Sequence, residues 1–111
     1  MICVSIPLRT ARGLNNREHH MARHRRVKAE RQAVAWALVG KAKPALPVVV
    51  TLTRLAPSRG LDEGDNLEGS LKAVRDQVAE WLGVDDRDPR VKWEYAQRRA
   101  PWGVQIEVRT A

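Results

Sequence analysis

The chain has 111 residues and a mass of 12.5 kDa, which predicts one domain over 1–111, because single cores commonly form at about 100–150 residues. Its apolar content of 43% argues against wholesale disorder. No apolar run approaches the roughly 18 residues of a membrane-spanning helix, and we expect no signal peptide and no membrane association. The single cysteine, Cys3, excludes an internal disulfide, so we expect a reducing, cytoplasmic setting with Cys3 as a small core residue.

Charge divides the chain into two unlike halves. The net charge is +7 and the pI about 10.5, values that favour a polyanionic partner such as nucleic acid or a membrane surface. Residues 1–60 carry twelve Lys and Arg against two acidic residues, a surplus of +10, whereas 61–111 carry eight against eleven, a balance of −3. A basic protein that concentrates its carboxylates in one stretch is a candidate for a cation site, with solvated helix ends and loops as the alternative interpretation.

The hydropathy pattern predicts six elements. In chain order they are a strand over 2–8, a helix over 20–40, a strand over 47–55, a helix from 65 or 66 to 82, a strand over 90–98 and a strand over 103–110. Gly40 and Gly83 are expected to end the helices, Pro7 to mark the end of a strand or an edge strand, and Trp93 and Tyr95 to face the core. The order β-α-β-α-β-β predicts an α/β (α+β) two-layer domain with a mixed sheet and two helices, its last two strands forming a hairpin.

Acidic residues gather at both ends of the second expected helix, in the runs DEGDN (62–66) and DDRD (85–88). About 17 residues at 1.5 Å each separate these ends by about 25 Å, so the runs meet only if the later loop returns across the sheet edge or a second subunit brings its own loop. If they meet, the carboxylates give the oxygen environment that Mg²⁺ prefers, and such an ion activates water and neutralises phosphate charge. Lys72, seven residues after Asp65 on the same helical face, could then reach a phosphate. Helix caps and turn residues are the alternative interpretation.

Basic residues gather before and within the first expected helix. They are Arg17, Arg23, Arg25, Arg26, Lys28 and Arg31, with His19, His20 and His24 interleaved. Several arginines near one helix start can grip successive phosphates, although a solvated helix face has the same composition. His20 and His24 are spaced for zinc, but the sequence offers no usual third ligand and no HExxH motif, so we do not favour a zinc site.

Two runs resemble the RusA family of Holliday junction resolvases, which is common in phages and prophages. They are DNLEGSLKAVRDQVAEWLGVDDRDPRVKWEYAQ over 65–97 and PLRTARGLNNREHH over 7–20. The resemblance implies a homodimeric endodeoxyribonuclease that uses Mg²⁺, or alternatively Mn²⁺, and no small-molecule cofactor. It implies paired symmetric nicks in four-way DNA junctions during recombination and repair, in the cytoplasm of a bacterial host.

The same resemblance implies the site residues. The family's carboxylates, which are catalytic and hold the metal, fall on Asp65, on the acid two positions earlier and on the later Asp-Asp loop. Glu63 stands two positions earlier, and Asp62 would match if the loop carries one extra residue; in the later loop Asp86 is favoured and Asp88 kept open. The family's lysine position holds Gly69, and Lys72, one turn further on, is the proposed substitute. The expected DNA-binding residues are Asn16, Arg17, Arg23, Arg25, Arg26 and Lys28.

Two other functions fit the same sequence. A catalytically degenerate junction-binding protein of phage origin would keep the fold and the charge, and the departures Glu63 and Gly69 agree with it. A basic structural phage protein would show no preference for a four-way junction over duplex DNA.

Overall fold

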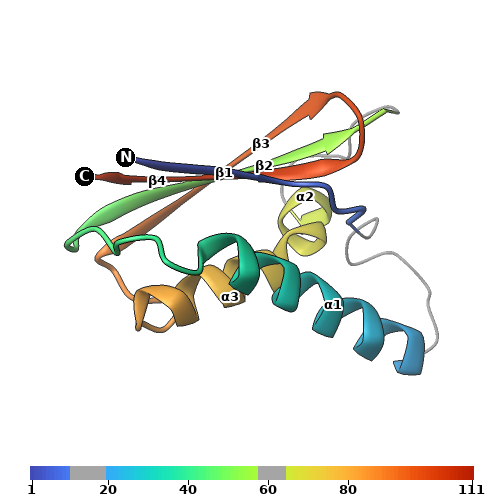
Figure 1. Cartoon of the computed structure of the whole chain (residues 1–111), viewed down its shortest axis with the longest axis horizontal. Helices are drawn as coiled ribbons and strands as arrows, with labels where there is room; N and C mark the ends of the chain where they lie inside the picture. The colour runs from blue at the N-terminus through green and yellow to red at the C-terminus, as the bar shows by residue number, and fades with distance from the viewer. Residues whose placement is uncertain (11–19, 58–64) are drawn as a thin grey trace.

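The computed structural model describes residues 1–10, 20–57 and 65–111, the side chain of Asp65 excepted. The elements are β1 (Ile2–Ile6), α1 (His20–Leu38), β2 (Val48–Ala56), α2 (Asp65–Ser70), α3 (Lys72–Leu82), β3 (Val91–Arg99) and β4 (Gly103–Thr110) (Figure 1). Four strands form one mixed sheet and the helices cover one of its faces, which confirms the expected two-layer α+β fold.

The strand order is β1-β4-β2-β3. β2 and β3 run parallel, whereas β4 is antiparallel to both of its neighbours, β1 and β2. The prediction that the last two strands form a hairpin is therefore wrong, because β2 lies between them. The chain after β3 passes the end of β2, where the Ala100 N–H donates a hydrogen bond to the Ala56 carbonyl oxygen at 3.0 Å. Alternation within a strand shows which side chains face the core but not which strand lies alongside.

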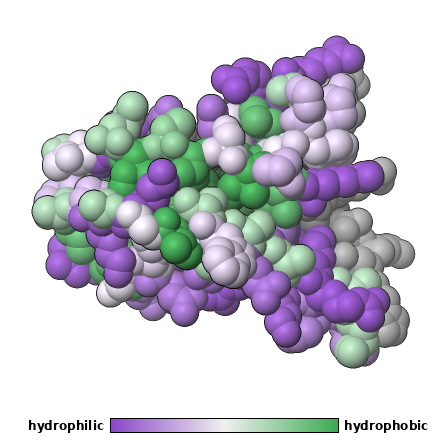
Figure 2. Space-filling model, viewed as in Figure 1, coloured by the Kyte–Doolittle hydropathy of each residue, from purple (hydrophilic) through white to green (hydrophobic). Residues whose placement is uncertain are grey.

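The core lies between the sheet and the helices. Alternate residues of β2 and β4 face it, and Val34 and Leu38 of α1 are fully buried there. Figure 2 shows apolar residues gathered in the middle of this view, with hydrophilic residues around them. Each fully buried aliphatic side chain contributes about 1.5–3 kcal/mol, so this layer fixes where α3 and the loop after it lie.

β1 is an edge strand, as Pro7 indicated. Its residues Ile2, Val4 and Ile6 pack on the core side, and Ile6 is buried. Cys3 alternates with them and is exposed, so the prediction of Cys3 as a core residue is wrong. The reason is the two-residue period of a strand, which turns Cys3 toward the sheet face away from the helices.

The second expected helix is divided in two. Leu71, with φ −106° and ψ 7°, separates α2 from α3. The Ser70 hydroxyl donates to the Leu67 carbonyl oxygen at 2.8 Å, and the Leu71 N–H donates to the Glu68 carbonyl oxygen at 3.1 Å. A serine hydroxyl that bonds the preceding turn, with the tighter Leu71 bond, explains the interruption of an otherwise continuous apolar stripe. The expectation of two helices is corrected to three.

Glycines end α1 and α3, as predicted. Gly40 has φ 77° and Gly83 has φ 78°, the left-handed conformation that glycine adopts without strain. The Gly83 N–H donates to the Glu80 carbonyl oxygen at 3.0 Å and closes the last turn of α3. Among the described residues, no helix is both long and apolar enough to cross a membrane.

Candidate active site

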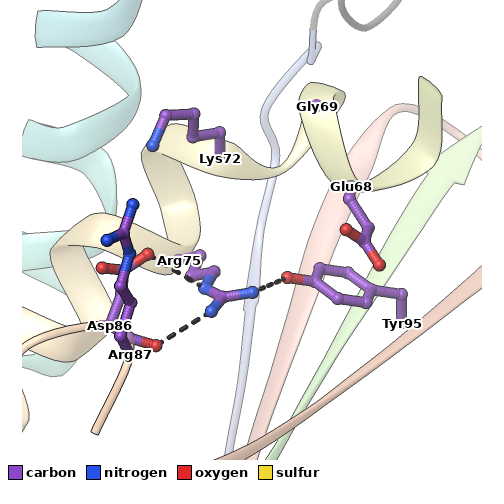
Figure 3. Close-up of a pocket in the computed structure, with 7 residues that line it drawn as sticks. All are labelled: Glu68, Gly69, Lys72, Arg75, Asp86, Arg87 and Tyr95. Atoms are coloured by element: carbon purple, nitrogen blue, oxygen red, sulfur yellow. Dashed lines mark hydrogen bonds and ion pairs between the residues drawn. The ribbon is translucent and has the colours of Figure 1, made fainter. Parts of the chain in front are cut away.

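A pocket of about 250 Å³ lies where α2, α3, the loop after α3 and β3 meet. The residues that line it are Glu68, Gly69, Lys72, Arg75, Asp86, Arg87 and Tyr95 (Figure 3). The pocket is open to solvent and combines three cationic side chains with two carboxylates. It contains two of the predicted catalytic residues, Lys72 and Asp86, which lie fourteen positions apart in the sequence.

Arg75 organises this pocket from the middle of α3. Its Nη1 donates to the Tyr95 hydroxyl at 2.6 Å and its Nη2 to the Asp86 carbonyl oxygen at 2.8 Å (Figure 3). Its Nε forms an ion pair with Asp86 Oδ2 at 3.4 Å without a hydrogen bond. The guanidinium also stacks on Trp93, 4.8 Å from the ring centroid. Arg75 therefore joins α3, β3 and the intervening loop through one mostly buried cation.

Asp86 reaches the pocket because the loop after Gly83 runs back alongside α3. Its carbonyl oxygen accepts hydrogen bonds from Arg75 and from Trp93 Nε1, the latter at 3.0 Å. Asp86 thereby lines one pocket with Lys72 and Arg75 of the first half of α3, and a second hollow with Glu80 and Gly83 at its end.

The other two aspartates of this loop are held in the turn. The Asp85 carboxylate accepts a hydrogen bond from the Arg87 N–H at 2.8 Å, which lowers the pKa of Asp85. Asp88 accepts from the Arg90 guanidinium, with its Oδ2 2.8 Å from Nη2, and from the Arg90 N–H at 2.9 Å. These contacts lower the pKa of Asp88 to about 2. Neither Asp85 nor Asp88 lines the pocket of Figure 3.

The pKa of Tyr95 is shifted in the opposite direction to those of Asp85 and Asp88. Removal from water raises the pKa of the Tyr95 hydroxyl, and the neighbouring Arg75 only partly offsets this. The phenol therefore stays protonated at neutral pH. It accepts a hydrogen bond from Arg75 and keeps its own proton available for a ligand in the pocket.

A second hollow, of about 220 Å³, adjoins the first and carries the basic side of α1. Arg23 and Arg26 line it together with Gly69 and Lys72, which line both hollows. Arg26 Nη1 is 2.6 Å from Oε2 of the buried Glu30, whereas Arg23 is exposed. The remaining two predicted DNA-binding residues of α1, Arg25 and Lys28, are exposed as well. A cationic surface thus leads from α1 to Lys72.

Several predicted site residues lie outside the described part of the chain. They are Asn16, Arg17, Asp62 and Glu63, and for Asp65 only the backbone is described, as the first residue of α2. Within residues 1–10, 20–57 and 65–111, no three His, Cys, Asp or Glu side chains are grouped for a metal ion. The described pocket has two carboxylates, Glu68 and Asp86, which lie on opposite sides of Arg75 in Figure 3, and carboxylate oxygens are the ligands that Mg²⁺ prefers.

Four of the lining residues were not predicted as site residues: Glu68, Arg75, Arg87 and Tyr95. Glu68 and Arg75 follow Asp65 by three and ten positions, so a helical face drawn from Asp65 would have found them. Tyr95 was assigned to the core, where its ring does pack, but its hydroxyl faces the pocket. No sequence signal marks Arg87, because its position depends on the turn.

The comparisons with known proteins add no assignment. No model of a known protein family matches the chain, and no curated protein gives a significant match. The function must therefore be argued from the pocket, the charge and the motifs. The likeness to RusA resolvases remains a hypothesis from the runs over 7–20 and 65–97.

Proposed function

We propose that the protein is a Mg²⁺-dependent endodeoxyribonuclease that resolves four-way DNA junctions by paired nicks, in recombination and repair. One observation carries the proposal most: Lys72 and Asp86 line a single pocket together with Glu68, which follows the acidic run 62–65 by three positions in the sequence. The adjoining hollow, with Arg23 and Arg26, provides cations where flanking phosphates of a DNA substrate would lie. The likeness to RusA resolvases supplies the junction specificity of the proposal.

The roles follow from the chemistry of the side chains. Asp65, Asp86 and either Glu63 or Asp62 would hold Mg²⁺, which when bound activates water and neutralises charge on the phosphate. Lys72, whose side chain is 66% exposed, is free to swing from its 3.4 Å contact with Asp76 Oδ2 toward a phosphate oxygen. Arg75 keeps the Asp86 loop in place, and Asp88 remains the alternative ligand of that loop.

DNA binding is assigned to the basic half of the chain. Asn16, Arg17, Arg23, Arg25, Arg26 and Lys28 are the proposed contacts. Exposed arginines and lysines bind phosphates without reading sequence, so affinity should fall steeply with salt. The local surplus of +10 in residues 1–60 supports this assignment, since the acidic surplus is confined to the other half.

The protein is proposed to act as a homodimer in the bacterial cytoplasm, encoded by a phage or prophage. Two exposed apolar residues at the end of α1 support a protein interface: Trp36 is 77% exposed and Val39 is 65% exposed. A dimer would match two cuts to a two-fold symmetric junction. Sedimentation should then give twice the 12.5 kDa chain mass, and Trp36→Lys should shift the protein to the monomer without unfolding it.

A junction-nicking assay tests the proposed activity. A labelled four-way junction is incubated with the protein in Mg²⁺ or in EDTA, beside the variants Asp65→Asn and Glu107→Gln. Glu107→Gln is the matched control, because it also removes one carboxylate but lies on β4, outside both hollows. We expect paired nicks that require Mg²⁺, disappear in Asp65→Asn and persist in Glu107→Gln; equal cutting by all three proteins would contradict the assignment.

Gly69 favours a second candidate function. It lines both hollows at the position where the related family has its lysine, so the pocket has one cation fewer at that point. A protein that had lost activity in this way would bind four-way junctions in preference to duplex DNA and cut neither. Tight binding without nicks in either Mg²⁺ or Mn²⁺ would support this candidate over the nuclease.

A further inference from the structure

Arg54 is a charged residue in an apolar position. It lies on β2 between Leu52 and Ala56, on the side of the sheet that faces the core, and is only 4% exposed. Its Nε is buried and has no hydrogen-bond partner in the described part of the chain. Burial also lowers the pKa of its guanidinium, because removal from water disfavours the charged form. A buried cation that no described carboxylate opposes is costly, and a bound anion is one way to offset that cost.

A second arginine approaches the same place. Arg54 Cζ lies 5.5 Å from the ring centroid of Trp102, and Arg9 Cζ lies 4.8 Å from it. Both guanidinium groups therefore lie against the same indole ring. Across the described ranges, neither forms an ion pair with a carboxylate. Next to Arg9, the Thr10 hydroxyl is also buried without a hydrogen-bond partner.

The three side chains come from neighbouring strands at one end of the sheet. Arg9 follows β1, Arg54 is near the end of β2, and Trp102 directly precedes β4. Figure 1 shows α2 beneath this end of the sheet. Arg54 and Trp102 line neither of the two hollows described above. Two like charges held at one indole repel each other, and a bound anion would offset that repulsion.

We propose that Arg9, Arg54 and Trp102 form a binding site for one phosphate group of the DNA backbone. The guanidinium fork binds phosphate oxygens in pairs, and the indole holds both forks in position by cation–π contact. Arg9, which is exposed, makes the first contact at the surface, and Arg54 supplies the buried charge. The assignment of the phosphate to DNA rests on the proposed function, whereas the anion site itself rests on the unpaired cations.

The salt dependence of junction binding tests this site. A labelled four-way junction is titrated in EDTA, so that cutting plays no part, at salt concentrations between about 50 and 200 mM. Arg9→Gln and Arg54→Gln are compared with Lys92→Gln, which removes the same charge from an exposed lysine of β3 that pairs with Val49, at the other end of β2 from Arg54. Each lost phosphate contact should lower the slope of log affinity against log salt by about one, so the salt-induced loss of affinity becomes about threefold to fourfold smaller.

We expect the reduced slope in Arg9→Gln and Arg54→Gln and the wild-type slope in Lys92→Gln. Arg54→Lys keeps the charge and should keep the slope while binding more weakly, because it lacks the fork. If Arg54→Gln does not fold, as circular dichroism would show, Arg9→Gln decides. The site would be overturned if Arg9→Gln and Arg54→Gln both kept the slope of the unmodified protein. It would also be overturned if the unmodified protein bound no junction. Failure to nick DNA, with the slopes reduced as expected, would contradict the nuclease and leave the site standing.

Discussion

At the scale of single residues, the candidate site depends on Arg75 more than on any carboxylate. Its guanidinium bonds Tyr95 and Asp86 and stacks on Trp93, so one side chain holds the pocket's wall and its acidic loop. The Asp86 carboxylate is 31% exposed and lies 3.4 Å from the Arg75 Nε, so it borders the pocket beside the cation that holds its loop.

Replacing Arg75 should destabilise the protein and disorganise the pocket together. Arg75→Met removes the two hydrogen bonds that the charged guanidinium donates, to the Tyr95 hydroxyl and to the Asp86 carbonyl oxygen. The free energy of unfolding should fall by about 2–4 kcal/mol. Urea unfolding measures this change. The matched control is Arg98→Met, an exposed residue expected to change stability by less than about 0.5 kcal/mol. Equal stability of the two variants would show that Arg75 does not organise the loop.

The Asp88–Arg90 pair predicts how the loop responds to acid. The pKa of Asp88 is about 2 in the folded chain, against a usual 3.8, because Arg90 favours the carboxylate. Since the folded pKa is depressed, the stabilisation is present above pH 4 and is lost as pH falls from about 4 toward 2. Carbon-detected NMR of the Asp88 carboxyl should give a midpoint near 2 and, in Arg90→Gln, a higher midpoint that stays below 3.8, because the backbone N–H of residue 90 still donates to the carboxylate. The same midpoint in both proteins would contradict the pairing.

Residue types in the sequence predicted part of this site. Lys72 and Asp86 were chosen from motif likeness, and the structure brings them to one pocket. Arg87 and the contrast between Asp86 and Asp88 were not predictable. Both depend on the turn over 84–90, in which hydrogen bonds from Arg87 and Arg90 hold two of three chemically equivalent aspartates.

At the scale of elements, periodicity predicted the four strands and α1 within a few residues, but it merged α2 with α3 and did not show which strands pair. The apolar stripe Leu67, Leu71, Val74 and Val78 is fully or almost fully buried, as its spacing indicates. The same stripe conceals the break at Leu71, because the buried face continues across it. The hairpin prediction failed for a similar reason, since β3 is an edge strand beside β2 and keeps the same alternation that it would have beside β4.

The end of α3 offers a test of how the acidic loop is directed. Gly83 has φ 78°, and an added Cβ would meet nothing within 4 Å, so only conformational strain opposes substitution. Gly83→Ala should cost about 1–2 kcal/mol, whereas Gly83→Asn should cost less because asparagine tolerates this conformation. Thermal unfolding measures both. A neutral Gly83→Ala would contradict the left-handed end of α3.

At the scale of the whole molecule, the fold brings together the two halves that differ in charge. α1, from the basic half, packs against α3, from the acidic half. Lys72, at the start of α3, lines both the candidate active-site pocket and the adjoining hollow that carries Arg23 and Arg26. Arg31 Nη2 of α1 is 2.6 Å from Glu80 Oε2 of α3, one link across this boundary. A DNA strand over the arginines of α1 would thus be directed toward Lys72 and Asp86, which composition alone could not show.

The most direct test of this account compares Asp86→Asn with Asp88→Asn in the Mg²⁺-dependent nicking of a four-way junction. Asp86 lines the pocket with Lys72, whereas Arg90 holds Asp88 in the turn. Loss of a metal-holding carboxylate should lower the rate by about 100-fold or more, and loss of a turn residue by less than about threefold. The account predicts the large loss in Asp86→Asn alone; full activity of Asp86→Asn, or the large loss in Asp88→Asn alone, would contradict it.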